Sequence, residues 1–282
     1  MQKHRFFPCL SLALLLIFPV ALQASGFKTI DVPNATETDC NDVNTAGIIV
    51  GFYADASGVD HGFVYSNSVK SFDVPGSTAT LGYGINDKNQ VVGWYTDTLG
   101  VTHGFGYSGG KFVTIDPPGS ILTNAWSINN SGVIVGTYVD GVNGIYHGFT
   151  LTGTTYTTYD APSSQLTQFT GINDAGAQVG LFRDTNGVQH GFALAAGHFT
   201  QIDVPGSAVT AADRINSNNQ IVGLFGTNTN GPFSGYLEQG GRFTTIMYPG
   251  STETRTRGLS STTAVGRYTD NTGLIHGYSV SR

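Results

Sequence analysis

One phrase recurs six times along the sequence, and this repetition constrains the fold more than any other feature. The glycine of a Val-Gly pair returns every 42–44 residues. A His-Gly pair and a proline return at the same interval, so three independent markers define six copies of one unit. The Val-Gly glycines are Gly51, Gly93, Gly136, Gly180, Gly223 and Gly266.

Each copy contains four short runs that are typical of strands. In the second copy they read "TLGYGIN", "QVVGWYTD", "THGFGYS" and "KFVTIDPP". The runs are rich in β-branched and aromatic residues, and turn-forming Asn, Asp and Gly separate them. Four strands in about 40–45 residues match one propeller blade, which buries its apolar face only against its neighbours. We therefore predict an all-β fold, a six-bladed β-propeller of four-stranded blades, with a β-solenoid as the alternative.

The phase of the repeat predicts a closed ring. Residues 27–32 read as the fourth run of a copy, whereas residues 256–282 supply only the first three runs of the last copy. The N-terminal strand is therefore expected to complete the last blade, which leaves only short sheet edges exposed. The predicted propeller domain covers residues 25–282.

The first 24 residues have the features of a secretory signal peptide. Lys3, His4 and Arg5 precede an apolar run to Leu22, and Ala24 provides a small residue at the cleavage point. An amphipathic or buried helix is the alternative. Because no second apolar span follows, we expect no membrane span in the mature chain and a secreted or periplasmic protein.

Charge and cysteine content limit the binding partners and the disulfides that the chain can have. The formal net charge is −6, and it becomes −8 once Lys3 and Arg5 leave with the signal. An acidic chain argues against a nucleic-acid partner. Cys9 lies in the signal, so Cys40 has no disulfide partner and is expected to be a small buried residue. We expect a monomer with no cofactor.

The repeat resembles the HAF-repeat family of bacterial extracellular proteins. The resemblance lies in "GINDxGxxVGxYxDxxGxxHGF" followed by "GGxFxTIDVPGS", and it covers nearly the whole mature chain. The naming triplet differs, since His-Gly-Phe stands at 61–63, 103–105, 147–149 and 190–192, and His-Gly-Tyr at 276–278. The resemblance implies export and repetition, and it carries no assigned reaction or catalytic residues.

The repeated polar residues are interpreted as structural. Equivalent histidines in neighbouring blades lie about one sheet spacing apart, roughly 10 Å, which is too far for a shared metal ion. Each histidine is instead expected to tie its blade to a neighbouring loop. The loop aspartates Asp55, Asp97, Asp140, Asp184 and Asp270 are expected to accept backbone N–H bonds in turns. "GYSGG" at 106–110 matches a nucleophile elbow only formally, because it lies in a predicted hairpin.

The candidate site lies where the copies differ. The start of each innermost strand carries a constant Thr and two variable positions, which we expect to rim the central channel on the face with the loops between blades. Arg can grip an anion and aromatic rings can stack on a sugar. The predicted ligand-binding residues are Asn41, Tyr83, Asn124, Trp126, Gln168, Arg214, Arg255 and Arg257.

Three functions stay open from these residues. The first is binding of a glycan-like or small anionic ligand at the channel mouth. The second is a secreted polysaccharide hydrolase or lyase that uses carboxylates there, for which the candidates are Glu37, Asp39, Asp213 and Glu253. The third is a scaffold that binds another protein or a surface. A structural role, in which these residues fill the channel and pair with one another, is the alternative to all three.

Overall fold

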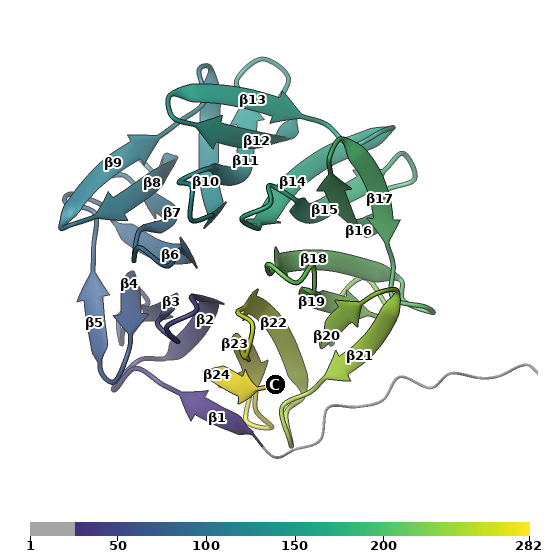
Figure 1. Ribbon diagram of the computed structural model, residues 1–282. Helices are drawn as coiled ribbons and strands as arrows, with labels where there is room; N and C mark the ends of the chain where they lie inside the picture. The colour runs from purple at the N-terminus through teal and green to yellow at the C-terminus, as the bar shows by residue number, and fades with distance from the viewer. Residues whose placement is uncertain (1–25) are drawn as a thin grey trace, which may run out of the picture.

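The computed structural model describes residues 26–282, which form 24 strands arranged as a closed ring of six blades (Figure 1). The predicted signal peptide and its cleavage point lie outside these residues. Within residues 26–282, no helix is long and apolar enough to span a bilayer.

Each blade is an antiparallel sheet whose first strand lies innermost. Blade 1 contains β2 (Glu37–Val43), β3 (Ile49–Ala54), β4 (Asp60–Tyr65) and β5 (Val69–Phe72). Blade 2 contains β6 (Ala79–Ile85), β7 (Val91–Thr96), β8 (Thr102–Ser108) and β9 (Lys111–Ile115). Blade 3 contains β10 (Ser120–Ile128), β11 (Ile134–Asp140), β12 (Tyr146–Thr152) and β13 (Thr155–Tyr159).

The second half of the ring repeats this order. Blade 4 contains β14 (Ser164–Ile172), β15 (Gln178–Asp184), β16 (Gln189–Ala195) and β17 (His198–Ile202). Blade 5 contains β18 (Val209–Ile215), β19 (Ile221–Gly226), β20 (Ser234–Gln239) and β21 (Arg242–Ile246). Blade 6 contains β22 (Glu253–Leu259), β23 (Thr263–Thr269), β24 (Ile275–Ser281) and, as its outer strand, β1 (Phe27–Ile30).

The predicted closure by the N-terminal strand is confirmed. β1 pairs antiparallel with β24, in a register that places Phe27 opposite Val280 and Ile30 opposite Gly277. Ile30 is 4% exposed, and the Phe27 ring lies 5.3 Å from the ring of Tyr248 in the connection between blades 5 and 6. The strand next to the predicted cleavage point is thus part of the ring (Figure 1).

The Val-Gly marker has a packing origin. The valine of each pair is fully buried, and Val50, for example, packs with Val74, Ile85 and Phe105 of the next blade. The glycine lies against the innermost strand, and a Cβ at Gly51 would overlap the carbonyl oxygen of Asp39. The glycine of each pair therefore lets the second strand of a blade approach the innermost strand closely, and the valine packs against the next blade.

Every innermost strand carries a β-bulge at the same place. In β18, for example, Ala212 pairs with Gly223 and Arg214 pairs with Val222, so Asp213 has no partner in the ladder. A bulge re-aims the extra residue and frees its backbone groups. The six bulge residues occupy the second variable position of the copies; they are Asn41, Tyr83, Trp126, Thr170, Asp213 and Arg257.

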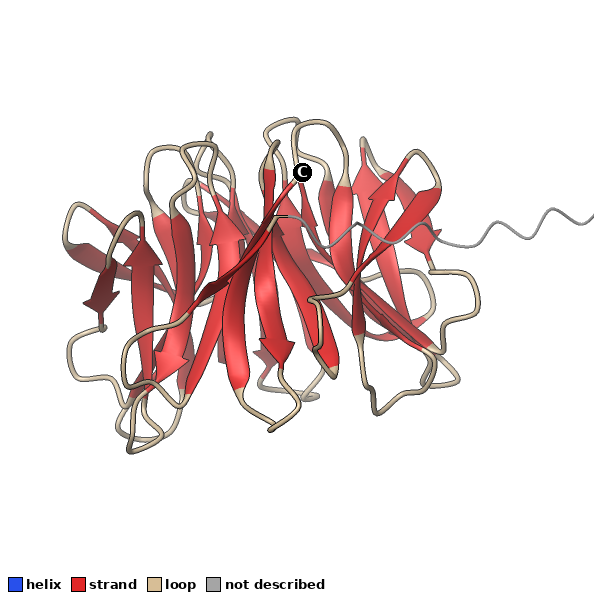
Figure 2. Cartoon of the chain, turned by 90° about the horizontal axis from the view of Figure 1, so that it is seen from below, coloured by secondary structure: helices blue, strands red, loops and turns tan. Residues whose placement is uncertain are grey.

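The two faces of the ring differ in their loops (Figure 2). We call one the interblade face; it carries the connections between blades, such as residues 73–78, and the loops between second and third strands, such as residues 55–59. The hairpin face carries the turns between first and second strands, such as residues 44–48. In five of the six blades the constant Thr holds the innermost strand to the connection before it, as in blade 2, where the Thr80 hydroxyl accepts a hydrogen bond from Val74 N at 3.0 Å.

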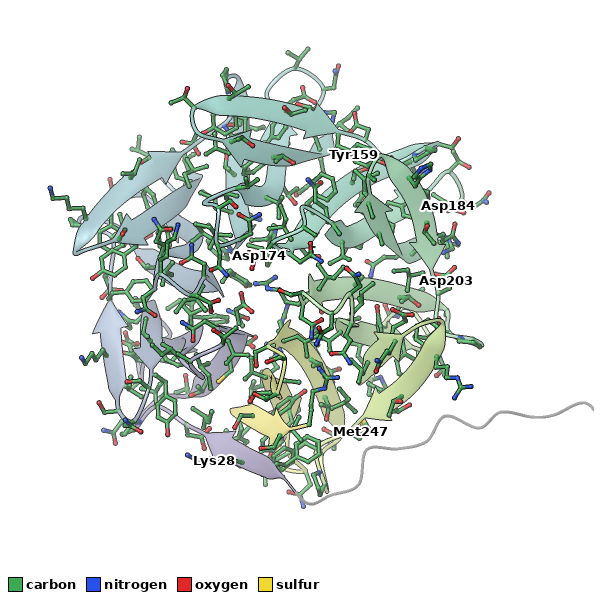
Figure 3. The ribbon with its side chains drawn as sticks, in the orientation of Figure 1. Lys28, Tyr159, Asp174, Asp184, Asp203 and Met247 are labelled. Carbon is green, nitrogen blue, oxygen red and sulfur yellow. The ribbon has the colours of Figure 1, made fainter. Side chains whose placement is uncertain are left out.

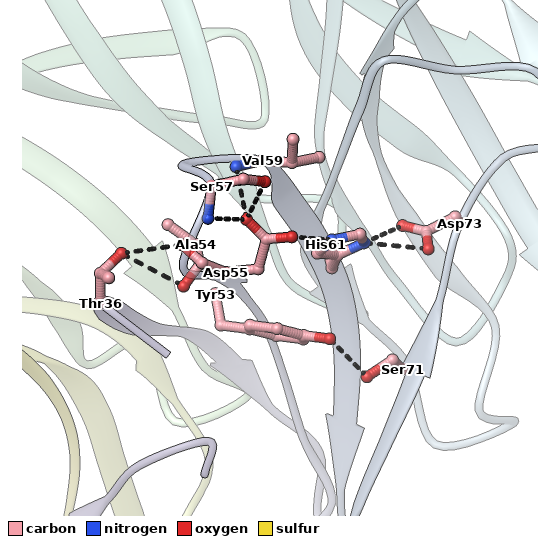
Figure 4. Close-up of polar contacts among 9 residues, drawn as sticks. All are labelled: Thr36, Tyr53, Ala54, Asp55, Ser57, Val59, His61, Ser71 and Asp73. Carbon is pink, nitrogen blue, oxygen red and sulfur yellow. Dashed lines mark hydrogen bonds and ion pairs between the residues drawn. The ribbon is translucent and has the colours of Figure 1, made fainter. Parts of the chain in front are cut away.

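The repeated histidine forms a His–Asp latch, a histidine between two aspartates of the same blade (Figure 4). His61 Nδ1 lies 3.0 Å from Asp73, which follows the outer strand, and Nε2 lies 3.4 Å from Asp55 in the adjacent loop. The prediction that the histidine ties its blade to a neighbouring loop is confirmed, since Asp55 lies in the loop after the second strand and Asp73 in the connection that follows the outer strand. The prediction for Asp55 is confirmed, since its Oδ1 accepts backbone N–H bonds from Ser57 and Val59.

Candidate functional site

A pocket of about 260 Å³ opens on the interblade face, above blade 5 and next to the channel. We call it the blade 5 pocket. Its lining includes five of the predicted candidates and, among the residues that the sequence did not single out, three with large side chains. These eight are Trp126, Gln168, Asp213, Arg255 and Arg257, with Gln189, Leu224 and Phe233.

The pocket exists because blade 5 carries small side chains at its mouth. The first variable position of β18 is Ala211, where other blades have Leu81, Gln168 or Arg255. Ala211 pairs with Leu224 on β19, and both lie on the floor of the pocket. A missing side chain at one place in a ring of otherwise larger residues leaves a hollow.

Blade 5 is also the blade that lacks the His–Asp latch. Ser234 stands in place of the histidine, and Met247 stands where the other blades have the outer-strand aspartate. Figure 3 labels Met247 at the outside of the ring next to blade 6, and Asp203 in the corresponding position after blade 4. The loop before Ser234 instead presents Phe233 to the pocket.

Arg255 is held in place by two neighbours. Its Nε donates a hydrogen bond to Glu253 Oε1 at 2.6 Å, and its guanidinium lies over the Phe233 ring, 4.8 Å from the centroid. Glu253 Oε2 in turn accepts a hydrogen bond from the backbone N of Phe233 at 3.2 Å. The guanidinium is therefore preorganised, and its η nitrogens donate no hydrogen bond to any group of residues 26–282.

Arg257 lies deeper than Arg255. Its side chain is 18% exposed, and its Nε lies 3.7 Å from Asp39 Oδ2, its one ion-pair partner within residues 26–282. Burial lowers the pKa of Arg257, but Asp39, Tyr83, Asp213 and Glu37 together outweigh burial and the net pKa is raised. Arg257 is thus permanently charged, and it lines the pocket.

Three of the four candidate catalytic carboxylates are in ion pairs. Glu253 pairs with Arg255, Glu37 accepts a hydrogen bond from Arg267 Nη1 at 2.8 Å, and Asp39 lies 3.5 Å from the same nitrogen. Burial raises the pKa of Glu37, and Arg267 opposes it. Among these four, Asp213 alone lines the blade 5 pocket and has no ion pair within residues 26–282.

Arg214 does not lie at the channel mouth, so its predicted position is wrong. It is 5% exposed in the middle of the channel, where its Nη atoms donate to the carbonyls of four bulge residues. Its Nε lies 3.2 Å from Asp42 Oδ2. The bulges leave these carbonyls outside the sheet ladders, and one guanidinium satisfies them. The four residues are Tyr83, Trp126, Thr170 and Asp213.

The remaining candidates divide between the pocket and the channel wall. Asn41 donates its amide to Gly82 O at 2.8 Å, and Tyr83 is 7% exposed and packs edge-on against Trp126 at 4.4 Å. Asn124 does not line the blade 5 pocket. Trp126 does so, and its buried Nε1 has no hydrogen-bond partner within residues 26–282.

The hairpin face has a funnel of about 190 Å³ around the channel axis. Asparagines line it, and five of them donate to a backbone carbonyl of the next blade, as Asn44 does to Asn86 at 3.2 Å and Asn86 to Asn129 at 3.0 Å. Asp174, labelled near the centre of the ring in Figure 3, accepts hydrogen bonds from Asn130. Arg214 forms part of the floor of this funnel.

The sequence contains a signal for one of the missed residues, Leu224. The residue after each Val-Gly pair also varies, and it pairs across the ladder with the first variable position, as Arg267 does with Arg255. The side chains at this position shape the channel mouth together with those of the inner strand. They are Phe52, Trp94, Thr137, Leu181, Leu224 and Arg267.

No arrangement of three or more His, Cys, Asp or Glu side chains suited to a metal ion occurs in residues 26–282. Cys40 is fully buried and free, as predicted.

Comparisons with known proteins show a shared fold at low identity. The Aleuria aurantia lectin, solved with α-methyl-L-fucoside, is 11% identical over 89% of this chain and 93% of its own, with a TM-score of 0.52. The propeller domain of the trilobed protease from Pyrococcus furiosus is 10% identical over 88% and 82%, with a TM-score of 0.54. A Hadza microbial sialidase is 10% identical over 88% and 66%, with a TM-score of 0.55.

No protein-family model matches the chain, and no curated protein does. The resemblance to HAF repeats thus remains an expectation from the sequence. The lectin is described as a six-bladed β-propeller, and this chain has the same fold.

Proposed function

We propose that this protein is exported and binds a glycan or a small anionic ligand in the blade 5 pocket. The observation that carries the proposal is the convergence of two guanidinium groups and two aromatic rings on one small hollow, from Arg255, Arg257, Trp126 and Phe233. The signal-like N-terminus supports export to the periplasm or the medium, and the mass of the exported protein tests its removal. We propose a monomer.

The chemistry of the pocket suits a sugar. Its volume of about 260 Å³ lies just below that of pockets for drug-sized ligands, so it fits a small ligand or one residue of a chain. Trp126 and Phe233 offer apolar surface for the face of a sugar ring. Gln168 and Gln189 add amide groups that donate to and accept from hydroxyls.

The solved propellers add limited support. The Aleuria aurantia lectin carries a fucoside, so a six-bladed ring of this kind is able to hold sugars. At 11% identity, no binding residue is transferred from it.

Binding is favoured over hydrolysis or elimination because of the carboxylates. A hydrolase needs two carboxyl groups that flank the scissile bond. Glu37, Asp39 and Glu253 are engaged with arginines, and only Asp213 opens into the pocket.

A panel of acidic and neutral sugars, titrated by calorimetry, tests the proposal. Replacing Arg255 with Ala should weaken binding roughly 10- to 100-fold, as expected for charge-assisted hydrogen bonds of about 1.5–3 kcal/mol. Phe233→Ala should weaken it as well, through loss of the stacking surface. The exposed Arg242, on the hairpin-face side of β21, gives a matched control, and Arg242→Ala should bind as the wild type does.

Arg255 is preferred to Arg257 for this test. Removing Arg257 leaves buried Asp39 with Arg267 alone, so a fall in stability is expected along with a loss of binding. Unchanged binding in both Arg255→Ala and Phe233→Ala would exclude the blade 5 pocket as the site. Binding of no sugar or anion by the wild type would favour the scaffold function.

A further inference from the structure

Asp213 is the unmatched carboxyl of the channel cluster, which we define as four arginines and five carboxyl groups around the channel mouth and centre. Within residues 26–282, each of these four arginines has at least one carboxylate as an ion-pair partner, and Arg267 also lies 3.5 Å from Asp39. The pairs are Arg214–Asp42 at 3.2 Å, Arg255–Glu253 at 2.6 Å, Arg257–Asp39 at 3.7 Å and Arg267–Glu37 at 2.8 Å. Asp213 is the fifth carboxyl group, so its ionisation leaves the cluster with one excess negative charge.

The position of Asp213 makes that charge costly. It is 7% exposed, and its Oδ2 is buried without a hydrogen-bond partner from residues 26–282. It lines the blade 5 pocket beside Arg255 and Arg257. An unpaired buried charge is unfavourable, and the group tends to take up a proton instead.

The groups that face Asp213 come from four strands. β22 contributes Arg255 and Arg257, its own strand Arg214, β2 contributes Asp39 and β20 contributes the buried Tyr236. Burial raises the pKa of Asp213 to about 6, although the three arginines oppose it. Tyr236 is neutral, because burial raises its pKa well above the usual value.

We propose that the blade 5 pocket takes its ligand as a monocarboxylate sugar, such as a hexuronate, together with one proton from solvent, which Asp213 holds. This inference rests on the proposed function and specifies its ligand. The neutral carboxyl donates its O–H to the ligand carboxylate, while Arg255 and Arg257 donate N–H groups to the same anion. The proton removes the repulsion that two unmatched negative charges would cause.

A neutral sugar requires no such proton. Ionised Asp213 is able to accept a hydrogen bond from a sugar hydroxyl, and the charge of the cluster is then unchanged by binding. The pH dependence of affinity therefore separates an acidic ligand from a neutral one.

The experiment is calorimetric titration of the wild type with glucuronate, and with glucose as the neutral counterpart, at about pH 5 and about pH 8. We expect glucuronate to bind at least tenfold more tightly at the lower pH, which corresponds to a change of about one unit in the pKa of Asp213 on binding. Titrations at about pH 7 in two buffers of different ionisation enthalpy count the protons directly, and a one-unit rise in the pKa predicts an uptake of roughly 0.4 proton per ligand.

Asp213→Asn keeps the shape of the side chain and cannot titrate. The affinity of this variant for glucuronate should be the same at both pH values. Every histidine of the His–Asp latches is retained in it, so this result would show that the histidines do not cause the pH dependence. Asp87→Asn, on the hairpin face, is the matched control and should keep the pH dependence of the wild type.

Several results would overturn the inference. These are equal affinity of the wild type at both pH values, no proton uptake in the two buffers, or a pH dependence that persists in Asp213→Asn. If glucuronate fails to bind at either pH while a neutral sugar binds in an Arg255-dependent way, the acidic ligand is wrong and the proposed function still stands. The buffer comparison needs no variant, so it decides the matter even if Asp213→Asn fails to fold.

Discussion

Arg214 is expected to be the most important single side chain for the stability of the ring. Its guanidinium donates to the carbonyls of Tyr83, Trp126, Thr170 and Asp213 and pairs with Asp42, so one residue connects blades 1 to 5. The perturbation is Arg214→Met, which keeps an unbranched side chain and removes the charge and all donors.

The magnitude follows from what the change leaves behind. Asp42 is 6% exposed and would lose its one arginine, and breaking a buried pair costs about 3–5 kcal/mol. The four carbonyls also lose their shared donor, but Arg214 lies in the floor of the funnel, so we expect water from the funnel to enter the space that its guanidinium leaves and to replace part of these hydrogen bonds. We expect a loss of about 3–5 kcal/mol in the free energy of unfolding, or roughly 6–15 °C in Tm.

Equilibrium unfolding in urea, followed by fluorescence and circular dichroism, measures the loss. Asp42→Asn combined with Arg214→Met should recover part of it, since the double variant leaves no uncompensated charge. A loss below about 1 kcal/mol for Arg214→Met would refute the reasoning, because breaking a buried pair costs several times more. An additive double variant would show that Asp42 and Arg214 do not stabilise each other.

Two further predictions concern the closure and the latches. A chain that begins at Pro33 lacks β1, buried Ile30 and the Phe27 contacts, so its free energy of unfolding in urea should fall by several kcal/mol. A melting temperature equal to that of the full protein would refute closure by β1. His103→Ala should cost only about 0.5–1 kcal/mol, because both of its aspartates are about three-tenths exposed, and an unchanged Tm together with an unchanged pH profile would contradict a stabilising latch. Burial lowers the pKa of His103, but the hydrogen bonds and charges of Asp116 and Asp97 outweigh burial, and the net pKa is raised. The latch therefore stabilises the fold fully below about pH 6.5, and this contribution is lost as the pH rises through the raised pKa.

The fold could be predicted from the sequence because its cause is repeated six times. The Val-Gly pair marks the same close approach in every blade, and the start of the chain in the phase of a fourth strand predicts β1 beside β24. The aspartates that contact the latch histidine were harder to predict from the sequence. The outer-strand aspartate is absent from the copy that also lacks the histidine, as Met247 and Ser234 show, and this shared loss is the signal that links the two residues.

The site could be predicted only in part. The positions that differ between copies include Trp126, Asp213, Arg255 and Arg257, and all four line one pocket. The hollow itself depends on the small side chain of Ala211, and a single small residue is not recognisable in a sequence as part of a binding site. Which carboxylates are neutralised depends on distances across the channel that the repeat does not encode.

The bulges explain why Arg214 was misplaced. It follows Asp213 directly, and the sequence predicts it beside Asp213 at the rim, but the bulge places these adjacent residues at different depths in the channel. Asp213 lines the pocket on one face, and Arg214 lies in the floor of the funnel on the other.

The position of a bound acidic sugar tests the central claim most directly. A crystal structure of the protein grown or soaked with a hexuronate at about pH 5, where Asp213 is protonated, would reveal it. The account predicts density in the blade 5 pocket, with the carboxylate against Arg255 and Arg257 and the ring against Trp126 or Phe233. Density in the funnel of the hairpin face, or at the His–Asp latches with the blade 5 pocket empty, would contradict it.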